Sequence, residues 1–149
     1  MRSLDFNCDL GEGCGQDAAI VPHISSASIA CGAHAGDEAT MRAAIASCLA
    51  HGVAIGAHPS FEDREHFGRR ELALAPGEIR ALVARQVDLL ASACAEAGTR
   101  LHHVKPHGAL YNLAARDAGV AAAIADAVRE ADAGLVLYGL ANSELTAAG

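Results

Sequence analysis

The sequence predicts an α/β fold, a (β/α) barrel present only in part, with about five strands that do not close. Short apolar runs alternate along the chain with longer stretches of helical periodicity. Three predicted helices are followed by a glycine just before the next strand, a common signal for a helix-to-strand loop. One face of four strands is polar, which is unusual for buried parallel strands and indicates a barrel interior near its rim.

The first half of the chain is expected to contain three strands and one helix. The strands are predicted at 4–9, 27–32 and 53–58. Between the second and third strands, apolar residues from Met41 to Leu49 recur at i, i+3, i+4, i+7 and i+8. This spacing predicts an amphipathic helix that begins near Asp37 and stops at Gly52.

The second half repeats the alternation of helix and strand. Pro76 suits the first position of a helix, and the apolar residues after it share one helical face. The elements expected are a helix from Pro76 to Gly98, a strand at 101–107, a helix from about Asp117 to Gly134 and a strand at 135–139. This order predicts a parallel sheet with helices outside. The length suggests one domain over residues 1–149.

The two faces of the predicted strands differ in chemistry, because successive side chains point to opposite sides. One set is apolar and is expected to face the helices: Leu4, Phe6, Cys8, Ala27, Ile29, Cys31, Val53, Ile55, Ala57 and Val104. The other is small or polar and is expected to line a shared cavity: Asn7, Asp9, Ser26, Ser28, Ala30, Ala54, Gly56, His58, His103, Lys105 and His107. His102 has the parity of the apolar set, so we expect it to be packed.

Composition argues against several classes of protein. Eleven Lys and Arg against 18 Asp and Glu give a formal charge of −7, and no basic run occurs, which disfavours nucleic acid and anionic membrane as partners. The longest charge-free run, 18–36, is too polar for a membrane span, and the start lacks the pattern of a signal peptide. Five cysteines without a C-x-x-C pair favour reduced thiols in the cytoplasm.

Polar groups follow four predicted strands, in the segments CDLGEGCG, CGAHAGD, GAHPSFED and KPHGALYN. Active sites of parallel α/β proteins lie beyond the carboxyl ends of the strands. The side chains expected to converge there are Asp9, Glu12, His34, His58, Lys105 and His107. His23, His51 and His66 are expected to be ordinary packed or surface residues.

Two chemistries fit this set, and the sequence leaves both open. Asp9, His34 and His58 are candidate ligands of a divalent metal that activates water. Alternatively, Asp9 and a histidine act as general base and acid while Lys105 stabilises developing negative charge. GEGCG is not a phosphate loop, because it lacks the G-K-[ST] ending and contains an acid.

Five motifs, DFNCDLGEG, ISSASIACGAHAGD, GVAIGAHPSF, FGRR and HVKPHGALYN, together resemble the LamB/YcsF family. They occur in the order and spacing of that family, from residue 4 to about residue 145. The resemblance implies a seven-stranded barrel related to the glycoside hydrolase/deacetylase fold. It also implies the role of the A component of a 5-oxoprolinase, which opens the lactam of 5-oxoproline to L-glutamate with ATP and the partner subunits B and C.

We assign roles from the residue pattern and the family resemblance together. The candidate catalytic residues are Asp9, His34, His58, Lys105 and His107, with Asp9, His34 and His58 also candidate metal ligands. The residues expected to bind substrate are Asn7, Glu12, Arg69, Arg70 and His103; the arginine pair of FGRR equally fits a solvated pair. The alternatives are a metal-dependent deacetylase or amidohydrolase, and a non-catalytic, fragmentary binding subunit.

The length limits how much of such a barrel this chain can build. A complete barrel of this kind takes about 250 residues, whereas this chain has 149. Five strands leave open edges on the first and the fifth strand. We therefore expect either a fragment or a chain that a partner completes.

Overall fold

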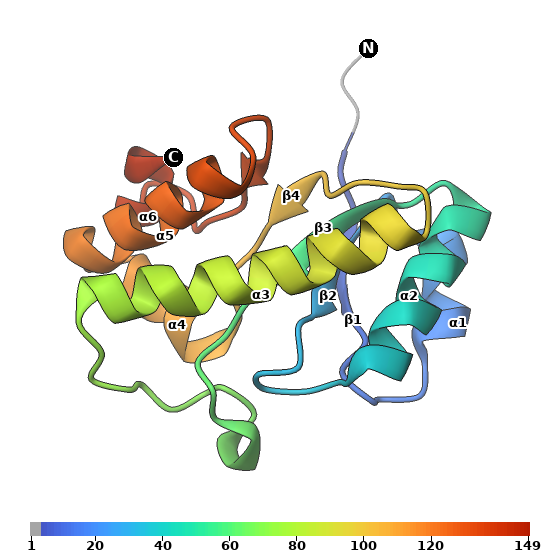
Figure 1. Cartoon of the computed structure of the whole chain (residues 1–149), viewed down its shortest axis with the longest axis horizontal. Coiled ribbons are helices and arrows are strands. Elements are labelled where there is room, and N and C mark those ends of the chain that lie inside the picture. Colours follow the sequence, from blue (N-terminus) through green and yellow to red (C-terminus); the bar gives the residue numbers. More distant parts are fainter. Residues whose placement is uncertain (1–3) are drawn as a thin grey trace.

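Five parallel strands form one sheet in the computed structural model, which describes residues 4–149 (Figure 1). In sheet order the strands are β1 (Asn7–Leu10), β2 (Ser26–Ala30), β3 (Ala54–His58), β4 (His103–Val104) and β5 (Val136–Leu137). Within the described residues β1 and β5 each pair with only one neighbour, so the sheet does not close. This confirms the predicted incomplete barrel.

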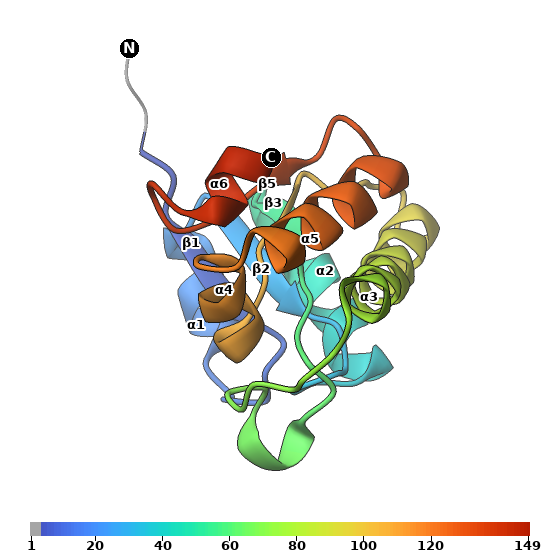
Figure 2. The ribbon, with the colours of Figure 1, turned by 90° about the vertical axis from the view of Figure 1, so that its left-hand side faces the viewer.

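Helices connect successive strands. They are α1 (Asp17–Ile20), α2 (Glu38–His51), α3 (Pro76–Glu96), α4 (Gly108–Ala114), α5 (Ala118–Ala131) and α6 (Glu144–Ala148), with short 3₁₀ turns η1 (Val21–His23) and η2 (Arg64–His66). Helix α3 crosses in front of the sheet in Figure 1, and Figure 2 shows it beside α5. Among residues 4–149, no helix combines the length and the apolar character that crossing a membrane requires.

Local sequence signals set the ends of the long helices. The Asp37 side chain accepts a hydrogen bond from the Thr40 backbone N–H at 2.8 Å, and Asp117 caps α5 in the same way. Gly52 ends α2 in the left-handed conformation, with φ of 67°, where glycine is favoured. The predicted starts near Asp37, Pro76 and Asp117 are therefore confirmed.

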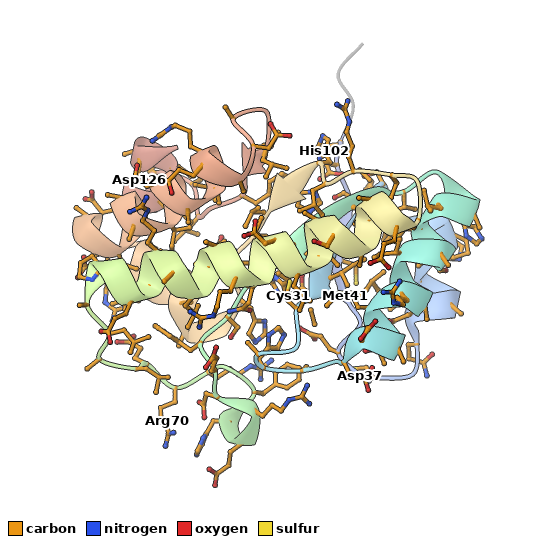
Figure 3. The ribbon with its side chains drawn as sticks, in the orientation of Figure 1. Cys31, Asp37, Met41, Arg70, His102 and Asp126 are labelled. Atoms are coloured by element: carbon orange, nitrogen blue, oxygen red, sulfur yellow. The ribbon has the colours of Figure 1, made fainter. Side chains whose placement is uncertain are left out.

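The face of the sheet that meets the helices is apolar, as predicted. Ala27, Ile29, Ile55, Ala57 and Val104 are buried in one cluster with side chains of α2, α3 and α5. In Figure 3, Cys31 and Met41 lie in this interior. This layer holds the strands in register, so the side chains at their carboxyl ends keep fixed relative positions.

The opposite face carries polar side chains in aligned rows. The register pairs Asp9 with Ser28, Ser28 with Gly56, and Gly56 with His103. A Cβ atom at Gly56 would collide with the imidazole of His103, which lies over it. Glycine at this position therefore lets the buried histidine fit against the sheet.

Three residues expected to be packed are exposed instead. Leu4 and Phe6 are 81% and 62% exposed, because strand β1 begins only at Asn7 and no helix within residues 4–149 covers the chain before it. His102 also faces solvent, beyond the amino end of β4, near the top of Figure 3. Parity assigns a side chain to one side of a strand but does not say whether the strand reaches that residue or whether anything covers that side.

In the second half of the chain, several helices and strands begin or end at residues other than those expected. The predicted strand at 101–107 shortens to β4, although the N–H groups of His102, Lys105 and His107 still donate to carbonyls of β3 and its extension. Two helices were not predicted: α4, formed by the segment GALYNLA, and α1. Helix α5 ends at Ala131, before Gly134.

Candidate functional site

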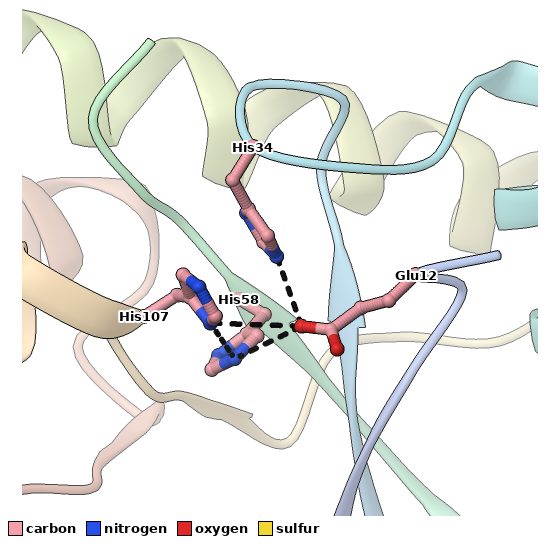
Figure 4. A group of neighbouring side chains, drawn as sticks. All are labelled: Glu12, His34, His58 and His107. Atoms are coloured by element: carbon pink, nitrogen blue, oxygen red, sulfur yellow. Dashed lines mark hydrogen bonds and ion pairs between the residues drawn. The ribbon is translucent and has the colours of Figure 1, made fainter. Parts of the chain in front are cut away.

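Four side chains from four separate segments meet beyond the carboxyl ends of the strands (Figure 4). Glu12 follows β1, His34 follows β2, His58 ends β3 and His107 precedes α4. Glu12 Oε1 lies 3.0 Å from His34 Nε2, 3.5 Å from His107 Nδ1 and 3.9 Å from His58 Nε2. The three histidines are buried. We refer to these four residues as the Glu–His cluster.

Backbone carbonyls fix two of the imidazole rings. His58 Nδ1 lies 2.6 Å from the carbonyl oxygen of Lys105, and His107 Nε2 lies 2.8 Å from that of Phe67. A carbonyl only accepts hydrogen bonds, so these two nitrogens carry hydrogen. The remaining nitrogens, His58 Nε2 and His107 Nδ1, face each other at 3.0 Å.

Charge in the Glu–His cluster follows from burial and close contacts. Burial raises the pKa of Glu12, but the hydrogen bond with His34 and the nearby histidines outweigh it and lower the pKa below its usual value. Burial, with the nearby His34, lowers the pKa of His107 to about 4. At neutral pH, Glu12 is therefore a carboxylate and His107 a neutral imidazole.

An ion pair adjoins the cluster. Lys105 Nζ lies 2.5 Å from Asp9 Oδ1, and Asp9 Oδ2 lies 3.2 Å from His58 Nε2. Burial raises the pKa of Asp9, but its contacts with His58 and Lys105 outweigh burial and hold the pKa well below the usual range. Asp9 is therefore ionised at neutral pH. Because Asp9 is ion-paired with Lys105, the geometry favours Asp9 as a charge partner over a general base.

A hydrogen-bond network on the polar face holds Lys105 in place. Asn7 Oδ1 accepts from Lys105 Nζ at 2.7 Å and from the Ser28 hydroxyl at 3.1 Å. Its amide nitrogen lies 2.8 Å from the Ser26 hydroxyl and 3.3 Å from His103 Nε2. Burial, with the nearby His102, lowers the pKa of His103 to about 4, so this ring is neutral at pH 7. Asn7 and His103, assigned to substrate binding, thus already have protein partners.

The two arginines of FGRR are not equivalent. Arg69 lies over the Phe67 ring, with its guanidinium carbon 5.3 Å from the ring centre. Arg70 extends from its loop near the bottom of Figure 3, where it approaches Asp63 at 3.4 Å. Of the pair, only Arg69 borders the site, because Phe67 contacts the rings of His34 and His107.

Phe67 and Gly68 contribute to the site and were missed by the sequence reasoning. The Phe67 carbonyl fixes His107, and its ring centre lies 5.3 Å from those of His34 and His107. A Cβ at Gly68 would collide with the Ser60 hydroxyl and crowd His34. The glycine of FGRR was an available signal, since an arginine pair by itself does not require a neighbouring glycine.

The fold and site define a class: an open parallel β/α barrel whose rim carries lysine, carboxylates and clustered histidines. Within this class, the sequence model of the LamB/YcsF family matches residues 4–149. The chain therefore belongs to the LamB/YcsF family.

Named relatives agree with this membership. The chain is 54% identical over 148 residues to the A component of 5-oxoprolinase from Bordetella pertussis, covering 96% of this chain and 59% of that protein. It is 52% identical over 154 residues to the same component from Tolumonas auensis, covering 100% and 61%. The chain thus spans about three fifths of the length of these relatives.

A solved structure shares the fold. The crystal structure of the lactam utilization protein from Thermus thermophilus matches with a TM-score of 0.96 and 45% sequence identity. The match covers 99% of this chain and 62% of that one. The two chains therefore share the arrangement of strands and helices over the matched part.

Proposed function

We propose that this chain carries the lactam-binding face of an ATP-dependent 5-oxoprolinase, which opens 5-oxoproline to L-glutamate. The names of its relatives support this reading, since the curated ones are named as a subunit of 5-oxoprolinase and the structural one as a lactam utilization protein. The word subunit supports an assembly, for which we propose subunits B and C as partners. Its free cysteines support a cytoplasmic location.

The observation that carries the proposal is the partly exposed Lys105–Asp9 pair at the rim. An ammonium group has three hydrogens to donate. Lys105 donates one hydrogen to Asn7 Oδ1 and forms an ion pair with Asp9 Oδ1, which leaves at least one hydrogen without a partner among residues 4–149. That hydrogen is available to the carbonyl oxygen of a lactam, while a free lone pair of Asp9 is available to the lactam N–H.

These contacts match what lactam opening requires. Water adds to the carbonyl carbon and the carbonyl oxygen gains negative charge. The C–N bond then breaks and the nitrogen takes the proton that the attacking water gives up. Lys105 stabilises the charged oxygen, and His58 keeps Asp9 in position. We assign the carboxylate of 5-oxoproline to Arg69, which lies over the Phe67 ring. A five-membered lactam resists water, so ATP supplies the driving force, through the partner subunits.

A second candidate is a metal-dependent amidohydrolase that acts without ATP. The Glu–His cluster favours it, because a carboxylate and imidazoles are common ligands of catalytic zinc. The two candidates differ in what removes activity. Omission of ATP stops a 5-oxoprolinase, whereas a metal-dependent amidohydrolase continues without ATP.

Glutamate release decides between them. The chain is mixed with subunits B and C, 5-oxoproline and ATP, and each component is omitted in turn; the longer Bordetella pertussis relative serves as the positive control. We expect release only when ATP and all subunits are present. Release by the chain alone, or release that continues without ATP, would contradict the proposal.

A further inference from the structure

Three acceptor atoms of the Glu–His cluster face one another. The other nitrogen of each ring donates to a backbone carbonyl, so a neutral ring presents a lone pair at His58 Nε2 and at His107 Nδ1. Asp9 Oδ2 lies 3.2 Å from the same His58 Nε2, so when no metal is bound a proton on this nitrogen joins it to Asp9. Glu12 Oε1 is the third acceptor. Lone pairs at such short separations repel one another, so the arrangement calls for a cation between them.

The separations of these atoms fit a metal ion. They are 3.0 Å between the two nitrogens, 3.5 Å from His107 Nδ1 to Glu12 Oε1, and 3.9 Å from His58 Nε2 to Glu12 Oε1. A triangle with these sides has its centre roughly 2 Å from each corner, which equals the usual length of Zn–N and Zn–O bonds, about 2.0–2.2 Å. A single proton can bridge only one pair of these atoms.

Neighbouring groups hold the three atoms in positions suited to binding a metal. Ligand imidazoles usually donate their second N–H to a carbonyl or carboxylate, as His58 and His107 do. His34 holds the ligand oxygen of Glu12 at 3.0 Å, while its own Nδ1 has no partner among residues 4–149. The ring of His34 is stacked on His107, 3.8 Å between centres, so the two cannot both point in-plane at one ion. His34 is therefore a positioning residue for Glu12.

We propose that Glu12, His58 and His107 bind one divalent transition metal, through Oε1, Nε2 and Nδ1. Two imidazoles and one carboxylate favour Zn²⁺ over the oxygen-seeking Mg²⁺ and Ca²⁺. Three protein ligands leave a fourth position open, the pattern of catalytic zinc sites. This set differs from the one expected from sequence, because Glu12 and His107 replace Asp9 and His34. The proposal does not depend on lactam cleavage, since its readout is binding.

Metal titration of the purified chain tests the site. After chelation and dialysis, the chain is titrated with Zn²⁺ and Mg²⁺ by calorimetry, and with Co²⁺ by visible absorption, which is intense for four-coordinate and weak for six-coordinate cobalt. We expect one Zn²⁺ per chain, the four-coordinate cobalt spectrum and no saturable Mg²⁺ binding. Absence of stoichiometric Zn²⁺ binding, or equal affinity for Mg²⁺, would overturn the proposal.

Variants identify the ligands. Glu12→Gln and His107→Ala should weaken Zn²⁺ binding by more than the roughly 10–100-fold that loss of an outer partner costs, and His34→Ala should fall within that range. The exposed His51→Ala and Cys14→Ser serve as controls and should bind as the parent does. Circular dichroism checks that each variant folds.

Asp9→Asn separates the two ligand sets. If it abolishes Zn²⁺ binding while Glu12→Gln does not, the set expected from sequence is correct and ours is wrong. Glu12 suits this comparison, because its side chain is 13% exposed and lies in a loop, so Glu12→Gln is expected to fold even where a buried histidine variant does not.

Discussion

Both faces of the sheet hold buried side chains, but one is filled by apolar side chains and the other by hydrogen-bonded polar side chains. Toward the helices, Ile29, Ile55 and Val104 are buried among apolar neighbours, and any side chain of similar shape would serve. On the opposite face, Ser28 and His103 are equally buried but are joined by specific hydrogen bonds. The two faces therefore do not differ in how exposed they are. They differ in that the contacts on the polar face are directional hydrogen bonds.

The comparison indicates which face of the sheet can position functional side chains. A buried polar group is costly unless it is paired, so a polar face persists only where partners are arranged for it. Asn7 uses both of its amide atoms in this way, and its oxygen is one of the two partners that hold Lys105. The apolar face makes the sheet rigid, and the polar face uses that rigidity to position charge.

Among changes to the polar face, removal of the Lys105 ammonium should have the largest effect on turnover. In the complete relative assembled with its partners, the variant equivalent to Lys105→Met should lower turnover of 5-oxoproline by roughly 10²–10³, as loss of a preorganised donor does. Stability should change by about 1 kcal/mol or less, because Asp9 is partly exposed and keeps His58 as a neighbour. Steady-state kinetics and thermal melts measure both; normal turnover with a lower melting temperature would mean that Lys105 is purely architectural.

Truncation on the apolar face should cost stability directly. Ile55→Ala should lower the free energy of unfolding by about 2–5 kcal/mol, because it leaves a cavity beneath the helices where Ile55 is 3% exposed. Ile55→Val, which keeps most of the volume, should cost only about 0.5–1.5 kcal/mol. Urea denaturation gives both values. Equal losses for the two variants would show that this face does not pack as described.

The buried His103 should make stability depend on pH. Its folded pKa of about 4 lies below the unfolded value of about 6.5, so between these pH values the unfolded chain binds more protons. Stability should therefore fall as pH decreases from about 6.5 to 4, by at most about 3 kcal/mol from this residue. His103→Gln should flatten that part of the curve relative to the parent. Parallel curves for the two proteins in denaturant melts would rule this out.

The smallest effect should come from one hydroxyl of the polar face. Ser28→Ala removes the buried contacts of this hydroxyl with Asn7 and His103. The Asn7 oxygen keeps its bond from Lys105 and His103 Nε2 keeps the Asn7 amide nitrogen, so the expected loss is about 1 kcal/mol. Ser92→Ala, on the exposed side of α3, should change stability by less than about 0.5 kcal/mol. Denaturant melts that give the same value for both serines would argue that the polar network is energetically unimportant.

Much of the fold was predictable because its signals are local. The caps at Asp37 and Asp117 and the glycine at 52 act through neighbours in the chain, so the helices they bound were placed closely. Helix α4 was missed because KPHGALYN was read as a strand followed by a loop. The exposure of Phe6 was missed because it depends on what covers the residue, which no local pattern contains.

The sequence by itself determined the alternation of strands and helices, the polar parity of the inner face, and the gathering of Asp9, His58 and Lys105 at one rim. Each follows from short-range periodicity and from the rule that parallel strands end at one edge. The tertiary structure alone decided the partners within that rim: Asp9 pairs with Lys105, and Glu12 meets the three histidines. The physical reason is how far along the chain the interacting residues are from one another. Periodicity fixes the direction of a side chain, whereas contacts of a few ångströms depend on loop paths such as that of Phe67, which only the packed chain sets.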